Sequence, residues 1–165
     1  MRKKTAAVVE PLPHAPITMV LGLLEHLRLA PGGREDLYKL GRPLGYELDE
    51  LLPVTEAAKR LGLVKVDSGD IELTTEGGHL AEAEEPERKK RLGRAVEGLP
   101  LVSEIRRAVE SRGGRVPRRE FLDKLQEHFS PVESERQLST ALDWARYAEL
   151  FDLDPDSEEF VLPQA

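Results

Sequence analysis

Cysteine is absent from this sequence of 165 residues. Its absence excludes disulfide bonds, thiolate zinc sites, iron–sulfur clusters and cysteine nucleophiles. A chain without cysteine fits the reducing environment of the cytoplasm, where we expect the protein to act. No apolar run approaches the roughly 20 residues needed to span a bilayer, so we expect no membrane insertion.

Sequence signatures of nucleotide and metal chemistry are also missing. No Gly-x-x-x-x-Gly-Lys-Ser/Thr phosphate loop occurs. The histidines are too scattered to form a helical zinc pair; they are His14, His26, His79 and His128. Alternating aspartates at Asp152, Asp154 and Asp156 lack the glycine and the terminal glutamate of a calcium loop. We therefore expect a protein that is not an enzyme and that has no cofactor or metal.

Hydrophobic periodicity predicts a mainly α-helical chain with small β-hairpins. The elements predicted in the first half are helices over 17–29, 34–44 and 47–62, strands over 63–66 and 71–74, and a helix over 75–83. Those predicted in the second half are a basic helix over 87–97, helices over 101–112, from Pro117 and over 132–149, and strands over 150–153 and 160–162.

The order helix, Gly-Gly, helix, helix, hairpin therefore occurs twice. Three helices followed by a two-stranded wing is the winged-helix order, so we expect two tandem winged-helix (winged helix-turn-helix-like) units. The predicted domains are a flexible N-terminal tail over 1–15, a first winged-helix unit over 16–85, and a basic linker helix with a second winged-helix unit over 86–165.

Several stretches of the chain resemble the C-terminal AAA-associated domain that follows the ATPase cassette in nitrate/sulfonate/taurine-type ABC transporters. These stretches are Gly22–Glu25, Gly32–Gly33, Asp36–Tyr38, Glu47–Pro53, Glu56–Ala58, Leu61–Gly62, Ile71–Thr74 with Gly77, and Leu138–Phe151. The resemblance implies a cytosolic accessory or regulatory role beside a transporter ATPase, and it implies no reaction. This sequence contains no ATPase cassette, so we expect a free-standing copy.

DNA binding is the main alternative, because many winged helices read the major groove. The charge of this chain disfavours it. The net charge is −7, and acidic residues outnumber basic ones in both candidate recognition helices, over 47–62 and 132–149. The second hairpin carries five acidic residues and no basic one. Each of these elements would face phosphates that require neutralisation.

One segment has the opposite charge. Between residues 88 and 119 there are 11 lysines and arginines against three aspartates and glutamates. The sequence leaves open whether this segment pairs with acidic wings of this chain or of a second copy, or meets an acidic protein, a lipid surface or nucleic acid. Its candidate interaction surface consists of Arg88, Lys89, Lys90, Arg91, Arg118 and Arg119.

Together these features predict a non-catalytic regulatory or protein-interaction module. The expected partner is a protein such as an ABC-transporter ATPase, or a second copy of the chain. The alternative is a winged-helix transcriptional regulator that uses the basic segment.

Overall fold

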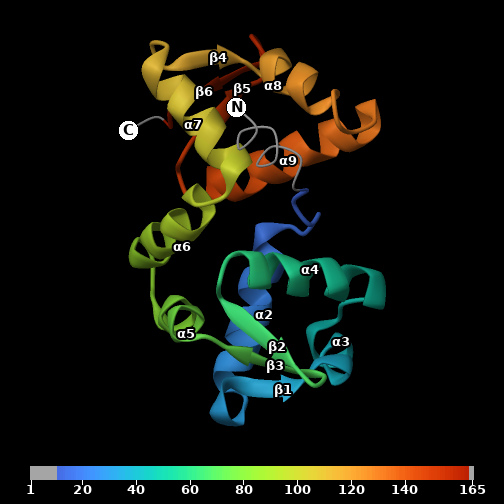
Figure 1. The fold of residues 1–165 in the computed structure, drawn as a ribbon. Coiled ribbons are helices and arrows are strands. Elements are labelled where there is room, and N and C mark those ends of the chain that lie inside the picture. The colour runs from blue at the N-terminus through green and yellow to red at the C-terminus, as the bar shows by residue number, and fades with distance from the viewer. Residues whose placement is uncertain (1–10, 164–165) are drawn as a thin grey trace. The chain divides into compact units, whose positions relative to one another are not determined.

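A computed structural model of the protein describes residues 11–163, which fall into two compact units (Figure 1). The N-terminal unit is Pro13–Leu92, and the C-terminal unit joins residues 11–12 to residues 93–163. Each unit is mainly helical and contains one small antiparallel sheet of three strands. No helix within residues 11–163 is long and apolar enough to cross a membrane.

The N-terminal unit is built around helix α2 (Ile17–Leu29), which contacts several helices of the unit and its sheet. The elements that follow α2 are η1 (Pro31–Gly33), β1 (Arg34–Asp36), η2 (Leu37–Lys39), α3 (Gly41–Leu44), α4 (Leu48–Arg60), β2 (Val64–Asp67), β3 (Asp70–Leu73) and α5 (Thr75–Glu82). Helix α6 (Glu87–Glu97) comes next, and the boundary between the two units falls within it, after Leu92. Val20, Leu23 and Leu27 recur at helical spacing and are fully buried in α2. The predicted helix over 17–29 is therefore confirmed.

The C-terminal unit repeats much of this order. Its elements after α6 are α7 (Pro100–Ser111), β4 (Arg115–Pro117), α8 (Arg118–Leu125), α9 (Pro131–Tyr147), β5 (Asp152–Asp154) and β6 (Glu159–Val161). Its core contains Trp144, which is fully buried, and a chain of edge-to-face aromatic rings. Phe160 lies 5.9 Å from Phe121 and 5.3 Å from Phe151, measured between ring centroids.

Each predicted hairpin forms and gains a third strand. The strand orders are β1-β3-β2 and β4-β6-β5, so a short strand from earlier in the chain pairs with the second strand of each hairpin. In the first hairpin the turn residues Ser68 and Gly69 have φ values of 54° and 83°. Two positive φ values are typical of the tight turn whose twist matches that of the flanking strands.

The predicted helix over 34–44 is wrong. Residues 34–36 form strand β1, which pairs with β3, and only Gly41–Leu44 is α-helical. The leucines of this segment have helical spacing, but Gly32 and Gly33 both have positive φ and turn the chain toward β3. Pairing with a strand more than 30 residues away outweighs the local periodicity.

Helix α4 is continuous from Leu48 to Arg60 and includes Pro53, so the chain does not start a fresh helix at that proline. Reciprocal hydrogen bonds between Glu47 and Glu50 form a capping box at its start. The predicted helices over 75–83 and 87–97 correspond to α5 and α6. Thr74 caps α5, because its hydroxyl accepts a hydrogen bond from the Gly77 N–H at 3.0 Å.

The predicted tail over 1–15 lies largely outside the described residues, which begin at residue 11. Within the described part of this segment, Leu12 is only 3% exposed, and its main chain is hydrogen-bonded to Gln137. Leu12 is therefore part of the folded C-terminal unit.

Candidate functional site

The outer face of α4 carries two leucines that no other part of its unit covers. Leu48 is 61% exposed and Leu52 is 46% exposed, and they lie one helical turn apart. The capping box sets where the helix starts, and the opposite face of α4 packs into the core through Leu51 and Val54. The two exposed leucines therefore form an apolar ridge on α4, which we call the α4 ridge.

The side chains that flank the α4 ridge are mainly acidic. Asp49 and Glu50 lie in the first turn, where negative charge is favourable next to the helix N-terminus. Glu56 is exposed one turn beyond Leu52, and it pairs with Lys59 at 3.3 Å. This surface lacks the excess of basic side chains that phosphate contacts require.

The predicted basic surface is divided between the two units. Arg88, Lys89, Lys90 and Arg91 belong to the N-terminal unit, whereas Arg118 and Arg119 belong to the C-terminal unit. Arg88 is held by three groups of its own unit. It donates to the Ala81 and Ala83 carbonyls at 3.2 Å each and to Glu25 at 3.3 Å. Arg88 thus closes the C-terminal end of α5.

Two of the other basic residues on α6 are also paired within the N-terminal unit. Lys89 lies 3.6 Å from Glu85. Arg91 lies 3.1 Å from both Glu76 and Glu87. The carboxylates that pair with Arg88, Lys89 and Arg91 come from α2, α5 and residues 85–87. Elsewhere in the basic segment, Arg115 does pair with acidic residues of the second hairpin. Lys90 points to solvent.

The two arginines of α8 differ in their surroundings. Arg118 forms an ion pair with Glu135 on α9, and its side chain is 19% exposed. Arg119 is exposed. Much of the positive charge predicted for an interaction surface is thus compensated by neighbouring carboxylates.

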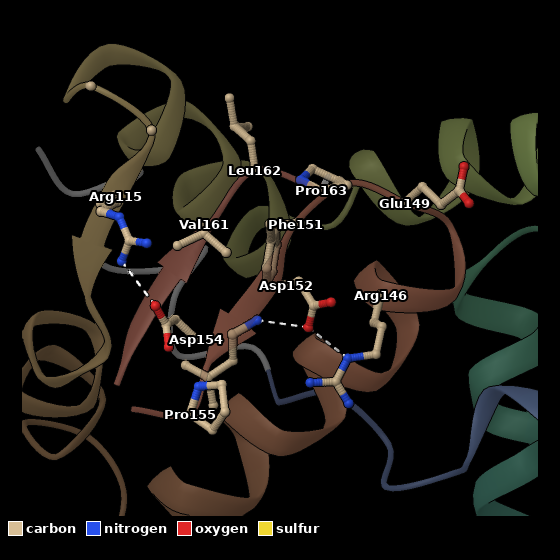
Figure 2. Close-up of a pocket in the computed structure, with 13 residues that line it drawn as sticks. Arg115, Arg146, Glu149, Phe151, Asp152, Asp154, Pro155, Val161, Leu162 and Pro163 are labelled. Atoms are coloured by element: carbon tan, nitrogen blue, oxygen red, sulfur yellow. Dashed lines mark hydrogen bonds and ion pairs between the residues drawn. The ribbon is translucent and has the colours of Figure 1, made fainter. Parts of the chain in front are cut away.

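A pocket of about 770 Å³ lies on the outer face of the C-terminal sheet (Figure 2). It is lined by Gly113, Gly114, Arg115, Arg146, Glu149, Phe151, Asp152, Leu153, Asp154, Pro155, Val161, Leu162 and Pro163. Figure 2 shows its two arginines directed at aspartates of β5. Arg115 lies 3.2 Å from Asp154, and Arg146 lies 2.7 Å from Asp152.

Hydrogen bonds shift the pKa of two residues that line this pocket, Asp154 and Arg115. The backbone N–H of Asp156 and the Arg115 guanidinium hold the pKa of Asp154 below its usual range. Hydrogen bonds to Glu159 and Asp154 raise the pKa of Arg115. The sequence analysis did not predict this pocket. The only signal of it in the sequence was the alternation of aspartates from Asp152 onward.

The N-terminal sheet has a smaller counterpart of the pocket. Arg34 at the start of β1 pairs with Asp70 at 3.2 Å and with Glu72 at 3.8 Å. Arg115 at the start of β4 pairs in the same way with acidic residues of the second hairpin. On the outer face of each sheet, the arginine is thus paired with carboxylates of the same sheet or hairpin. These arginines are therefore poorly placed to bind phosphate groups.

Side chains of the metal-binding types do not gather in the described part of the chain. Within residues 11–163, histidines and carboxylates form no group of three that could hold a metal ion. His26 lies 2.7 Å from Glu35 and links α2 to β1. Trp144 is fully buried in the core of the C-terminal unit.

Comparison with known proteins gives one match. No curated protein and no solved structure is significantly similar to the chain. The model of the family described as the C-terminal AAA-associated domain matches residues 38–154. This match covers most of the chain and includes strands β2 to β5 and the α4 ridge, whereas β1, β6 and part of the pocket lining lie outside the matched range. The protein therefore belongs to the C-terminal AAA-associated domain family.

Proposed function

We propose that this protein is a non-catalytic regulatory module that docks on an ABC-type ATPase on the cytoplasmic side of a membrane. Membership of the AAA-associated family supports an accessory role beside such an ATPase. The observation that carries the proposal is the α4 ridge, where Leu48 and Leu52 are exposed together. Exposed apolar residues that adjoin one another favour protein contacts.

The proposal includes two tandem winged-helix units. Its support is the order helix, short strand, helix, helix, hairpin, which both units follow. In that arrangement α4 takes the position of the helix that reads bases in DNA-binding relatives of the fold. Here this helix presents leucines and carboxylates, so we infer that the position is used for a protein partner. We expect the partner surface opposite the α4 ridge to be apolar and to be flanked by lysine or arginine.

The test is equilibrium binding of the full chain to the purified ATPase subunit of a nitrate/sulfonate/taurine-type ABC transporter. The double variant Leu48→Asp/Leu52→Asp should bind at least about 100-fold more weakly, since burying each leucine contributes roughly 1.5–3 kcal/mol. Aspartate is tolerated near a helix N-terminus, so this variant should remain folded.

A matched control is Val132→Asp, which changes an exposed apolar residue in the first turn of α9. This control should bind as the wild type does. Wild-type affinity in the double leucine variant would refute docking through α4, and no binding by the wild type would refute the ATPase partnership.

A further inference from the structure

A buried glutamine of α9 recognises the main chain of a distant segment. The Leu12 N–H donates to Gln137 Oε1 at 2.8 Å, and Gln137 Nε2 donates to the Leu12 carbonyl oxygen at 3.2 Å. Gln137 is 1% exposed, and 125 residues separate it from Leu12. One amide side chain thus satisfies both main-chain polar groups of Leu12, as a neighbouring strand would do.

The surroundings of Gln137 orient its amide. Gln137 Nε2 also donates to Glu133 Oε2 at 2.7 Å, which turns Oε1 toward the Leu12 N–H. Ser134 lies one turn before Gln137 on the same face of α9 and is fully buried, and within the described chain its hydroxyl has no hydrogen-bond partner. The site therefore retains an unused polar group, which is costly unless some ligand uses it.

The recognised segment has the character of a bound peptide. Leu12 is 3% exposed and lies between Pro11 and Pro13. Prolines on both sides favour an extended backbone and exclude the segment from helices. Leu12 ends the part of this segment that belongs to the C-terminal unit, because Pro13 begins the N-terminal unit. Leu12 is thus the deeply buried residue of the Pro11–Pro13 segment.

We propose that Gln137 and the side chains around Leu12 form a peptide-recognition site, occupied here by the chain's own Pro11–Pro13 segment. Its exchange partner is an extended segment of another protein with a leucine flanked by prolines. The amide pair contacts the main chain, the buried leucine side chain provides specificity, and the prolines keep the backbone extended. A short segment outside the helices and strands opens more readily than the core of a domain, which makes the exchange feasible. This inference does not depend on the proposed ATPase partner.

The test uses a fluorescein-labelled peptide of residues 8–16 and fluorescence anisotropy with the full chain. The Leu12→Asp protein, whose own segment is released, should bind the peptide at least about tenfold more tightly than the wild type does. The Leu12→Asp/Gln137→Ala protein should not bind it. A control protein, Leu29→Asp, changes an exposed leucine and should behave as the wild type does.

A peptide that carries aspartate in place of leucine should not bind the Leu12→Asp protein, and this comparison needs no second protein variant. Equal binding of both peptides, or binding of neither, would overturn the proposal. A wild-type dimer that the Leu12→Asp change abolishes would also overturn it, because the occupant would then be the segment of a second copy.

Amide hydrogen exchange of the wild type tests the same idea without any variant. The Leu12 amide should be protected, yet it should exchange at least about tenfold faster than the Leu138 amide of α9, because the segment opens locally. Exchange of both amides at one common rate would show that the segment leaves only when the unit unfolds, and would overturn the proposal.

Discussion

Gly77 lies where α5 crosses the main chain that leads into β2. A Cβ atom added at Gly77 would lie 1.9 Å from the Leu63 carbonyl oxygen, and the same oxygen accepts a hydrogen bond from the Thr74 N–H at 3.0 Å. The absence of a side chain therefore allows the start of α5 to dock on the hairpin. Nothing local in the sequence distinguishes Gly77 from its neighbour Gly78, so this close approach could not be predicted.

The pair Gly77 and Gly78 provides a matched test at the residue scale. Gly77→Ala should lower the free energy of unfolding by about 1–3 kcal/mol, because the new methyl group meets backbone that cannot easily move. Gly78→Ala should leave it unchanged or raise it by about 0.5–1 kcal/mol, because that position is helical and open. Urea unfolding followed by circular dichroism measures both. Equal losses in the two variants would contradict the close approach.

Among the elements, the longer helices were predictable from sequence and the short edge strands were not. Helix α2 has apolar residues at regular helical spacing, and its predicted ends match those in the structure. Strand β1 is Arg-Glu-Asp, which carries no alternating apolar pattern, and its partner strand begins at Asp70. The pairing of such a strand depends on the assembled unit, so local periodicity misassigned it as helix.

Arg88 of α6 connects three helices, because its side chain is hydrogen-bonded to the end of α5 and to Glu25 of α2. Arg88→Ala should lower the free energy of unfolding by about 1–2 kcal/mol, since it leaves the last carbonyls of α5 without this donor and Glu25 without its cation. Lys90→Ala, which changes an exposed lysine on the same helix, should alter it by less than about 0.5 kcal/mol. Chemical denaturation of the two variants tests this. A loss in Lys90→Ala as large as that in Arg88→Ala would contradict the structural role.

The second hairpin should show an acid dependence that involves Asp154. The pKa of Asp154 is lower in the folded chain than its ordinary value of 3.8. Its ionised form therefore stabilises the fold above pH 3.8, and this contribution is lost as the pH falls through the lower folded value. The melting temperature of wild type should exceed that of Asp154→Asn near pH 6, and the gap should shrink toward about pH 3. The exposed Asp123→Asn is the control, with a small gap throughout. A gap that widens in acid would contradict the sign.

At the scale of the whole molecule, the two units have a similar order of helices and strands. The net charge of −7 is unfavourable for binding DNA. The family and the mainly helical class follow from sequence patterns, because those patterns extend over most of the chain. Part of the positive charge of the candidate basic surface is paired within the two units, and its role as an interaction surface stays a prediction. Arg88 and Arg91 point at carboxylates of their own unit, and Arg118 points at Glu135. Which carboxylates would compensate these arginines depends on tertiary packing that the sequence alone does not reveal.

The distinction between a protein-docking module and a DNA reader rests on one measurement, the salt dependence of binding to the ATPase subunit and to random duplex DNA. Between about 50 and 200 mM salt, binding to the ATPase through the α4 ridge should weaken far less than duplex binding, because the buried leucines are not screened by salt; any duplex binding should be weak and should collapse. Arg88→Ala/Lys89→Ala/Lys90→Ala/Arg91→Ala should abolish residual duplex binding, while Arg136→Ala/Arg146→Ala should leave it nearly intact. Nanomolar, sequence-selective duplex binding that survives the higher salt and requires Arg136 or Arg146 would contradict the account.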